Sequence, residues 1–262
     1  RSLIFKVDPE KAHTLAIKSL KFNLVPNVFD ENKNDPIFQT KIFDKDLDNP
    51  IGMAAGFDKN AEVYNSLFKL GFGFVEVGTI TPLKQYGNPK PRVFRLVEDE
   101  ALINRLGFNN QGAQIVKERI KRNKKLGLLG INVGPNKDSS DRLNDYLIGL
   151  KTFYDDADYI TINISSPNTE NLRTFHEGDK LQDLLKSIME ERKNLKSNIP
   201  IAVKVSPDIS EDQVNQISEI LLRYEIKAII VSNTSEATRD KLSNIQRHQK
   251  GGLSGKPIEE KS

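Results

Sequence analysis

The chain alternates short apolar runs with longer amphipathic stretches. Apolar runs of strand length occupy residues 51–55, 74–77, 128–132, 159–163, 201–205 and 228–231. Stretches with helical periodicity lie between them, at residues 61–70, about 111–125, 142–154, 180–196 and 211–224. Strands that alternate with helices form parallel sheets with helical crossovers, so this order predicts an α/β protein. The runs are apolar almost throughout, which is typical of strands that are covered on both faces.

Six strand–helix units predict most of a (β/α)8 TIM barrel. Such a barrel has eight units, so its last two strands would lie beyond Ser262. An open, doubly wound sheet is the alternative fold. In a barrel the active site lies at the carboxyl ends of the strands, where we therefore expect the chemistry of this chain.

Three further segments do not follow the alternation. Residues 9–22 predict a short helix with Asp8 as its N-cap. Residues 92–104 predict a β-hairpin with an acidic turn, and residues 251–256, which contain three glycines, predict a loop. The helix either packs on the domain or lies on a membrane surface, where its lysines would meet anionic head groups.

Between this first helix and the barrel pattern, residues 23–36 are rich in Asn, Asp, Lys and Pro, as in a linker. We therefore divide the chain into an N-terminal helical segment with its linker, residues 1–36, and a β/α unit, residues 37–262. The length of 262 residues suits one such barrel or two small domains.

Composition narrows the classes of function. The formal charge of +3, from 39 basic and 36 acidic residues, is too balanced to indicate nucleic-acid binding. The chain contains no Cys, which excludes disulfides and thiolate chemistry, and only three His, which disfavours a histidine metal centre. No apolar run approaches the roughly 18 residues that a membrane-spanning helix needs.

Polar side chains follow the apolar runs at the point where each strand ends. The endings are Ala54-Ala55-Gly56-Phe57-Asp58-Lys59, Gly78-Thr79, Asn132, Asn163, Lys204 and Ser232-Asn233-Thr234, in strand order. In a barrel these groups would meet in one pocket that is lined by neutral amides and one or two cations. Such a pocket suits a flat ligand rich in carbonyl and N–H groups, because amides both donate and accept. It does not suit a divalent metal, which prefers carboxylates or imidazoles.

The fourth strand is followed at once by Asn163-Ile164-Ser165-Ser166-Pro167-Asn168-Thr169. A serine held in this turn could take a proton from a bound ligand if the site lowers the cost of doing so. The alternative is a plain turn of Asn, Ser and Pro residues. Because the other strands end in the same polar manner, the catalytic interpretation is the stronger of the two.

Seven motifs closely resemble those of class 2 dihydroorotate dehydrogenase, the quinone-linked flavoenzyme of pyrimidine (UMP) biosynthesis. They are AAGFDKN (54–60), GFGFVEVGTITP (71–82), GNPKPRVFRL (87–96), INRLGFNNQG (103–112), INISSPNT (162–169), AVKVSPD (202–208) and GGLSGKP (251–257). The motifs are long and specific, and the resemblance covers essentially the whole chain. The segment FKVDPEKAHTLAIKSLK near the N-terminus also looks like class 2, because class 1 enzymes lack it.

The resemblance implies FMN as cofactor and an oxidoreductase activity. The positions that match the family's FMN contacts are Ala55, Gly56, Phe57, Asp58, Lys59, Thr79, Asn132, Asn163, Lys204, Ser232 and Gly255. Among these, Lys204 would stabilise the negative charge that develops on the flavin during reduction. No metal is implied.

The same resemblance assigns the substrate and the base. The positions that match its dihydroorotate contacts are Lys59, Asn104, Arg105, Leu106, Gly107, Phe108, Asn163, Asn168, Asn233 and Thr234. Ser166 matches the general base, which would remove a proton from C5 while a hydride leaves C6, with Thr169 as a candidate neighbour in the proton path. Class 1 relatives use Cys at this position, and the absence of Cys from this chain agrees with class 2.

A membrane quinone would reoxidise the flavin in this class, entering beside the N-terminal helix. His13 and Arg95 match positions that line the family's quinone tunnel. The resemblance therefore implies a peripheral membrane protein, on the cytoplasmic face of a bacterial inner membrane or, as the alternative, on the mitochondrial inner membrane.

The chain departs from the family pattern in three places. Ser232 stands where Thr is usual, and Pro135 stands where Lys is common. The family's phosphate-binding segment, its last two strands and its closing helix have no counterpart within the 262 residues. We therefore expect these residues to be a portion of a longer chain; a truncated, inactive barrel fragment is the alternative, as is a class 1 enzyme coupled to fumarate or NAD.

Overall fold

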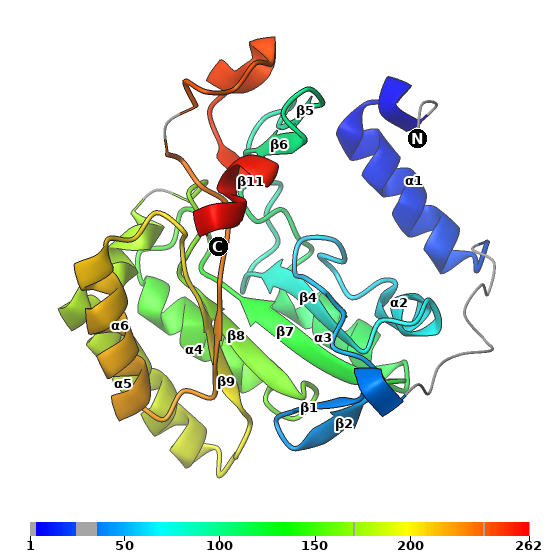
Figure 1. Cartoon of the computed structure of the whole chain (residues 1–262). Coiled ribbons are helices and arrows are strands. Elements are labelled where there is room, and N and C mark those ends of the chain that lie inside the picture. The colour runs from blue at the N-terminus through cyan, green and yellow to red at the C-terminus, as the bar shows by residue number, and fades with distance from the viewer. Residues whose placement is uncertain (1–3, 25–35, 170, 238, 262) are drawn as a thin grey trace.

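A curled parallel sheet forms the centre of the molecule (Figure 1). The computed structural model describes residues 4–24, 36–169, 171–237 and 239–261. The six strands are β3 (Gly52–Met53), β4 (Phe74–Ile80), β7 (Leu128–Val133), β8 (Tyr159–Asn163), β9 (Ile201–Lys204) and β10 (Ala228–Ile230). Their order in space is β10-β9-β8-β7-β4-β3, and all neighbours are parallel. The described residues thus form six strands of a (β/α)8 barrel architecture, as the sequence predicted.

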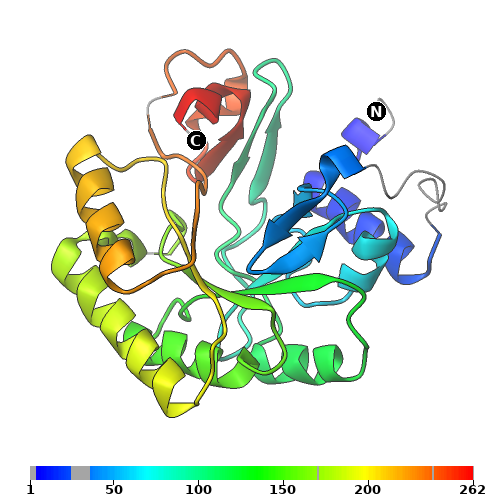
Figure 2. The ribbon, with the colours of Figure 1, turned by 60° about the horizontal axis from the view of Figure 1, so that its bottom comes forward.

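Helices cover the outer face of this sheet in an arc (Figure 2). They are α2 (Tyr64–Lys69), α3 (Ala113–Lys121), α4 (Arg142–Phe153), α5 (Gly178–Asn194) and α6 (Glu211–Arg223). Most bounds lie close to the predicted ones, but α2 begins at Tyr64 rather than at residue 61. The Asp58 carboxylate accepts the backbone N–H groups of Glu62 and Val63, at 2.8 and 2.7 Å, and holds these residues in a turn before the helix.

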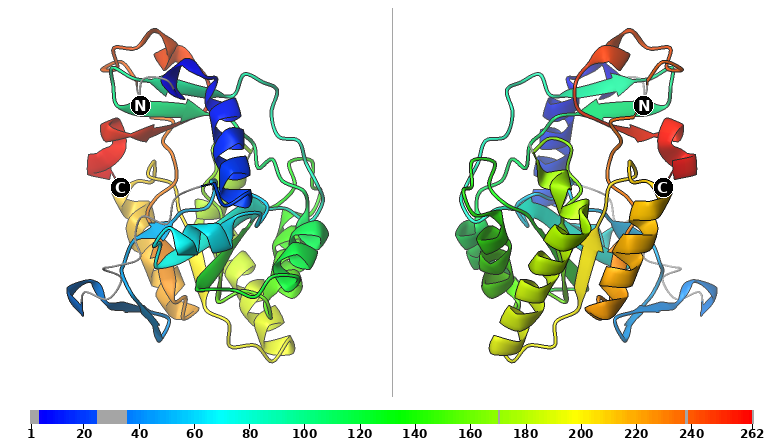
Figure 3. Two further views of the ribbon diagram at one scale, coloured as in Figure 1. Left: turned by 90° about the vertical axis from the view of Figure 1, so that its right-hand side faces the viewer. Right: turned by 90° about the vertical axis from the view of Figure 1, so that its left-hand side faces the viewer.

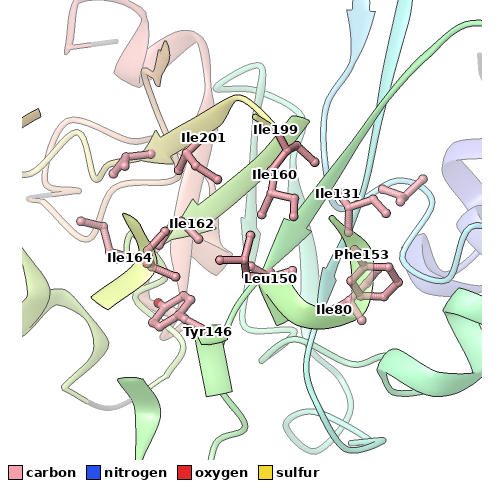
Figure 4. Close-up of a cluster of buried hydrophobic side chains, with 14 of the residues drawn as sticks. Ile80, Ile131, Tyr146, Leu150, Phe153, Ile160, Ile162, Ile164, Ile199 and Ile201 are labelled. Atoms are coloured by element: carbon pink, nitrogen blue, oxygen red, sulfur yellow. The ribbon is translucent and has the colours of Figure 1, made fainter. Parts of the chain in front are cut away.

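The outer face of the sheet and the inner faces of the helices share one apolar core (Figure 4). Every second residue of the central strands enters it, as strand geometry requires. On β8, for example, Ile160 and Ile162 are fully buried, and from α4 they meet Tyr146, Leu150 and Phe153. This core fixes the strands, and therefore the polar residues that follow them.

The N-terminal helix α1 (Pro9–Lys21) packs beside β5 and α2. Asp8 caps it by accepting the N–H of Lys11 at 2.9 Å, as expected. Glu10 forms an ion pair with the buried Arg92, with 2.6 Å between Nη2 and Oε1. Residues 25–35 of the expected linker lie outside the described residues. Within the described part of the chain, no helix has both the length and the apolar character needed to cross a bilayer.

A small antiparallel sheet stands at the carboxyl ends of the barrel strands (Figure 3). It has the order β11-β6-β5, with β5 (Val93–Leu96), β6 (Ala101–Asn104) and β11 (Gly252–Gly255). The hairpin β5–β6 was predicted. The predicted glycine-rich loop, however, is strand β11, because Gly252 to Gly255 pair in register with Asn104 to Ala101. The prediction of a loop was wrong because the pairing is long-range and local glycine content does not indicate it.

At the opposite end, the hairpin β1 (Thr40–Ile42) and β2 (Lys45–Leu47) lies below the barrel strands. Phe43 in its turn packs against Tyr159, with 5.1 Å between ring centroids, and Lys45 forms an ion pair with Asp158. Sequence patterning did not predict this hairpin, since its strands have three residues each. It covers an apolar layer inside the barrel, so the polar chemistry is confined to the other end.

Candidate active site

The inward face of the central strands becomes polar toward their carboxyl ends. Glu76, Asn132, Thr161, Asn163 and Lys204 occupy the alternate positions whose neighbours enter the outer core, and all five are buried. The strand register brings them together, because Asn132 pairs with Thr161 and Asn163 pairs with Lys204. Burial of so many polar groups is favourable only when they are hydrogen-bonded or meet a ligand.

Three of these strand ends are joined by hydrogen bonds. The hydroxyl of Thr79 donates to Oδ1 of Asn132 at 2.6 Å. Asn163 Nδ2 donates to Thr79 Oγ1 at 2.9 Å and to Asn132 Oδ1 at 3.1 Å. The structure thus brings together the predicted side chains from β4, β7 and β8.

The turn after β8 extends this cluster toward β10. Ser165 Oγ donates to Asn163 Oδ1 at 2.6 Å, and Asn233 Nδ2 donates to Ser165 Oγ at 2.8 Å. Next to Asn233, the buried hydroxyl of Thr234 has no hydrogen-bond partner among the described residues. A buried hydroxyl without a partner is costly in an apolar site, so this group is a candidate for contact with a ligand.

Ser166 lies in the same turn, and its side chain is buried. Its Oγ accepts the backbone N–H of Asn168 at 3.2 Å. Among the described residues the Ser166 hydroxyl donates to no acceptor, and no hydrogen bond joins it to Thr169. The Asn168 amide donates to the Asn104 backbone oxygen at 3.2 Å, which ties this turn to the end of strand β6.

Lys204 carries a buried ammonium group at the end of β9. Burial lowers the pKa of this ammonium, and the charge of Glu76 opposes that effect. In the described part of the chain, the ammonium has neither a hydrogen bond nor an ion pair within bonding distance. A buried cation of this kind is favourable only beside a ligand that brings negative charge or carbonyl oxygens.

The segment after β3 borders open space at Gly56. A Cβ built on this residue would meet no atom within 4 Å, and its φ of +110° lies in the region that favours glycine. Lys59 folds back over this segment and donates to the Gly56 carbonyl. Burial lowers the pKa of Lys59 to about 8, so the environment favours an anion beside it.

Some predicted cofactor and substrate residues use their side chains elsewhere. Asp58 is buried, and burial raises its pKa although three backbone N–H groups donate to its carboxylate. Arg105 turns away to Gln249, at 2.9 Å, and stacks over Phe94. Gly255 pairs with Ala101 at the outer end of the hairpin, three positions from the pair of Asn104 and Gly252. The side chains of Asp58 and Arg105 are therefore not gathered with the amides, and Gly255 lies at the other end of β11 from the residue that pairs with Asn104.

The remaining predicted cofactor and substrate positions lie on loops that follow β3, β6 and β10. Ala55 and Phe57 flank Gly56 and are partly buried, as is Ser232 after β10. Leu106, Gly107 and Phe108 form a loop that is held by Asn110, whose Nδ2 donates to the Phe108 carbonyl at 2.7 Å. Pro135, one of the departures from the family pattern, is buried, and its neighbour Gly134 lies against the Phe108 ring.

The two predicted quinone positions lie on the side of α1. His13 Nε2 is 2.7 Å from the backbone oxygen of Phe57, and the two rings meet edge to face. Arg95 donates to the Val7 carbonyl at 2.7 Å and lies over the Phe5 ring. The helix therefore touches the same segment, residues 55–59, that borders the candidate cofactor position.

Sequence reasoning missed four residues that organise the site. Glu76 and Thr161 lie inside apolar runs, Ser165 adjoins Ser166, and Arg173 follows the motif on the 3-10 helix Leu172–His176. Arg173 donates to the carbonyls of Ser165 and Thr234, at 3.1 and 2.9 Å, and pairs with Asp208. The signal for Glu76 and Thr161 was a polar residue at an alternate position of an otherwise apolar strand.

Comparison with known proteins identifies the family. The family model described as dihydroorotate dehydrogenase matches residues 37–262. The chain belongs to the dihydroorotate dehydrogenase family. The resemblance drawn from the sequence motifs is thereby confirmed, and the protein is an oxidoreductase of pyrimidine biosynthesis.

Two curated relatives of high identity come from bacteria. A protein named dihydroorotate dehydrogenase (quinone) from Bartonella tribocorum is 48% identical over 269 residues, which cover 100% of this chain and 73% of that protein. A protein of the same name from Agrobacterium fabrum is 46% identical over 266 residues, again covering 100% of this chain and 73% of that protein.

Solved structures of the family have the same fold. The ligand-free DHODH of Eimeria tenella superposes with a TM-score of 0.91 at 37% identity, covering 97% of this chain and 77% of that chain. The DHODH of the same organism in complex with ferulenol gives 0.89 at 36% identity, with 95% and 73% covered. In the described residues, no group of three or more His, Asp or Glu side chains could hold a metal ion.

Proposed function

We propose that this protein oxidises dihydroorotate to orotate, with FMN as hydride acceptor, Ser166 as general base and a membrane quinone as final electron acceptor. One observation carries the proposal. Among the described residues, the buried ammonium of Lys204 at the end of β9 has no partner, and the buried hydroxyl of Ser166 in the turn after β8 donates to no acceptor; the neighbouring strands β7 and β8 also carry amides that are already fixed. The family motifs occupy these same positions.

The residues present fit the isoalloxazine ring of FMN. Gly56 leaves open space beside the backbone of residues 54–59, which lets a flat ring approach closely. Lys204 offers its ammonium to the carbonyl end of such a ring, and the Thr79–Asn132–Asn163 cluster offers donors and acceptors at fixed positions. When bound, FMN would accept the hydride from substrate C6 and pass its electrons to the quinone.

Dihydroorotate is a cyclic imide with a carboxylate, and the site supplies partners for both parts. Asn104, Asn168 and Asn233 provide amides for the pyrimidine edge, and the first two are already joined at 3.2 Å. Lys59 provides a cation for the carboxylate. Its lowered pKa, about 8, means that a bound anion would also favour the charged form of the lysine.

Ser166 would take the proton from substrate C5. Its hydroxyl is buried, so water does not compete for it, and the Asn168 N–H holds its oxygen in place. A serine is a weak base, and it therefore needs a dry site and a proton path. Thr169 is buried in the same turn and remains the candidate for the next step of this path.

The first helix is the proposed membrane contact and quinone entrance. Lys11, Leu15, Lys18 and Phe22 recur at helical spacing and are all exposed, with Leu15 at 56% and Phe22 at 71%. Such a stripe of apolar and basic side chains suits the surface of an anionic membrane. The opposite side of the helix reaches Phe57 through His13, so a quinone beside this helix would lie next to the FMN segment. We place the protein on the cytoplasmic face of a bacterial inner membrane, and residues 1–36 act as its quinone and membrane segment.

The chemical proposal is tested by flavin reduction. The flavin-loaded protein is mixed with dihydroorotate, and the loss of flavin absorbance is followed. Ser166→Ala should slow this reduction by about 10²- to 10⁴-fold, the range expected for loss of a general base. Ser187→Ala, on α5, is the matched control and should reduce at the wild-type rate. A wild-type rate in Ser166→Ala would remove Ser166 as the base.

The acceptor and the membrane contact are tested separately. Steady-state turnover should require a quinone, and turnover with fumarate or NAD in its place would contradict the proposal. Leu15→Ser together with Phe22→Ser should release the protein from vesicles of anionic phospholipid. Leu126→Ser with Leu222→Ser changes two exposed leucines elsewhere, at 54% and 79%, and should leave binding unchanged.

A further inference from the structure

The loop that is proposed to contact the pyrimidine, residues 104–108, is held in its middle by one neighbouring segment, residues 85–88. The bonds run from Asn88 Nδ2 to the Arg105 carbonyl, from the Asn88 backbone N–H to the Leu106 carbonyl and from Gln85 Nε2 to the Gly107 carbonyl, each at 3.0 Å. The two ends of the loop are fixed independently, by the amides of Asn168 and Asn110. We call residues 104–108 the pyrimidine loop and residues 85–88 the clamp segment.

The clamp segment has a first anchor in the barrel, at the turn after β7. Asn136 Nδ2, the Lys137 backbone N–H and Lys137 Nζ donate to its side chains, at 3.0, 3.0 and 3.1 Å, and Asn110 pairs with Gln85 through the backbone. None of these bonds involves the N-terminal helix α1, so this anchor remains when α1 is changed.

The second anchor is the side chain of Arg92, which is 6% exposed. Its Nη1 donates to the Tyr86 and Asn88 carbonyls of the clamp segment, at 2.6 and 2.9 Å. The other edge of the guanidinium meets Glu10 on α1, with Nη2 2.6 Å from Oε1 and Nε 3.1 Å from Oε2. Among the described residues, Glu10 is the carboxylate that pairs with Arg92, and it also pairs with the exposed Lys90 at 3.4 Å.

Gly87 shows how closely these parts meet. A Cβ built on this residue would lie 2.8 Å from Arg92 Nη1 and 2.2 Å from the Leu106 carbonyl oxygen, and its φ is +77°. Glycine therefore lets the guanidinium and the pyrimidine loop approach the clamp segment at the same point.

We propose that Arg92 is a positioning residue for the pyrimidine loop and that Glu10 supplies the charge that keeps it in place, so that α1 contributes to the affinity for the pyrimidine. This inference rests on the proposed function for the identity of the ligand. Neither side chain needs to contact the ligand, because both act through the carbonyls of the clamp segment.

A role in docking α1 does not by itself account for this ion pair. Lys21 and Glu62 form another ion pair between α1 and the barrel, and it is solvated, with side chains 54% and 20% exposed. Arg92 and Glu10 are buried instead, at 6% and 17%, although burial of two charges has a desolvation cost that a surface pair avoids. Burial brings the Arg92 cation to the two carbonyls of the clamp segment, which a surface pair would not reach.

Glu10→Gln tests the proposal, because it keeps the shape of the side chain and removes the charge opposite Arg92. A buried cation without a counter-charge is costly and turns toward solvent, so the Tyr86 and Asn88 carbonyls lose their donor. Orotate, titrated against the flavin absorbance at pH 6.5, should bind about tenfold more weakly, which is less than the full cost of a broken buried pair because the first anchor remains. The rate of flavin reduction at saturating dihydroorotate should change by less than about twofold.

Glu62→Gln is the matched control. It also removes a carboxylate that ties α1 to the barrel, but this carboxylate bonds to Lys21 and not to the clamp segment. Orotate binding should stay within about twofold of the wild type, as for loss of a surface pair. Equal losses in Glu10→Gln and Glu62→Gln would overturn the proposal and indicate a general loosening of α1.

The sign of the change separates positioning from electrostatics at a distance. Burial lowers the pKa of Lys59 to about 8, and the charge of Glu10 opposes this shift. At pH 6.5 the Lys59 ammonium is charged, so the removal of a nearby negative charge would by electrostatics alone strengthen the binding of the orotate anion. Tighter or unchanged binding in Glu10→Gln would therefore contradict the proposal.

A double-mutant cycle shows whether Glu10 acts through Arg92. Arg92→Met should weaken orotate binding, and Glu10→Gln added to it should cause little further loss, because both changes break the same contact. Fully additive losses would refute the proposed route. If Arg92→Met does not fold, Arg92→Lys takes its place: it keeps the charge but cannot bridge the carboxylate and both carbonyls, so wild-type binding by this variant would refute the route equally.

Hydrogen exchange in the protein without orotate separates this inference from the proposed function. The Asn88 N–H, which donates to the Leu106 carbonyl, reports on the contact between the clamp segment and the pyrimidine loop. It should exchange faster in Glu10→Gln than in the wild type, but not in Glu62→Gln. Unchanged exchange in Glu10→Gln would overturn the positioning role. A wild-type protein that does not bind orotate would instead refute the proposed function, whatever the exchange rates are.

Discussion

The two faces of the central sheet differ in what their residues do. On β8, Ile160 and Ile162 point outward into the core, whereas Thr161 and Asn163 point inward to polar partners. All four are buried to the same degree, at 0 to 2% exposed. Burial alone therefore does not separate residues that stabilise the fold from residues that serve the site; the chemistry of the neighbours does.

The largest expected effect is the loss of stability on truncating a side chain of the outward face. Ile162→Ala leaves a cavity between β8 and α4, and the free energy of unfolding should fall by about 2–5 kcal/mol. Urea denaturation measures this change. Ile229→Ala on β10, where the side chain is 46% exposed, is the control and should cost less than about 1 kcal/mol. Similar losses in both would mean that the outward core does not dominate stability.

Removal of the inward cation should slow the reaction without lowering stability. Lys204→Met removes the buried ammonium, so flavin reduction should slow by about 10²- to 10³-fold, as for a lost electrostatic stabiliser. The free energy of unfolding of the flavin-free protein should stay the same or rise, because an unpaired buried charge is removed. Lys227→Met, on the exposed turn before β10, should change neither quantity. A large loss of stability in Lys204→Met would contradict the division between the faces.

Arg173 braces the turns above the inward face, so its removal should have a mixed effect. Arg173→Met breaks bonds to Ser165, Thr234 and Asp208. We expect a loss of about 1–3 kcal/mol in the free energy of unfolding, together with slower flavin reduction. Arg173→Lys keeps the charge but not the planar guanidinium, so its stability and its rate of flavin reduction should lie between those of the wild type and of Arg173→Met. Wild-type reduction by Arg173→Met would show that the turns do not need this brace.

The smallest expected effect is a dependence of stability on pH. Burial lowers the pKa of His176, whose Nε2 accepts the N–H of Ser206 at 3.2 Å. The unfolded chain therefore binds a proton first, near pH 6.5, so stability is full above that pH and falls as the pH decreases. Burial and the charge of Lys59 lower the pKa of His13 in the same direction.

Urea midpoints at pH 7.5 and 5.5 measure this loss. His176→Gln should give a smaller difference between the two pH values than the wild-type chain. Paired carboxylates such as Asp208 have lowered pKa values and lose their contribution only under more acidic conditions, outside this window. An equal pH dependence in His176→Gln would assign the effect to other groups.

The sequence predicted the strand ends well because each lies where an apolar run meets a polar residue, as at Asn163 and Lys204. Glu76 was missed because Val75 and Val77 surround it in the same run, and the run was treated as apolar on both faces. Strand β11 was missed for another reason: its partner β6 lies about 150 residues earlier, and no local pattern indicates such a pairing. Local sequence patterns therefore predicted the barrel strands and their ends, whereas the pairing of β11 with β6 depends on residues far apart in the sequence.

The pairing of β11 with β6 has a consequence for folding. Strand β6 carries Asn104, and it lies between β5, which contacts the N-terminal segment through Arg95, and residues 252–255. Contacts between such distant segments form slowly, because closing a long loop costs entropy before any bond is gained. The edge that is proposed to bind the pyrimidine is therefore assembled late, and a nascent chain acquires its barrel strands before it acquires affinity for its ligand.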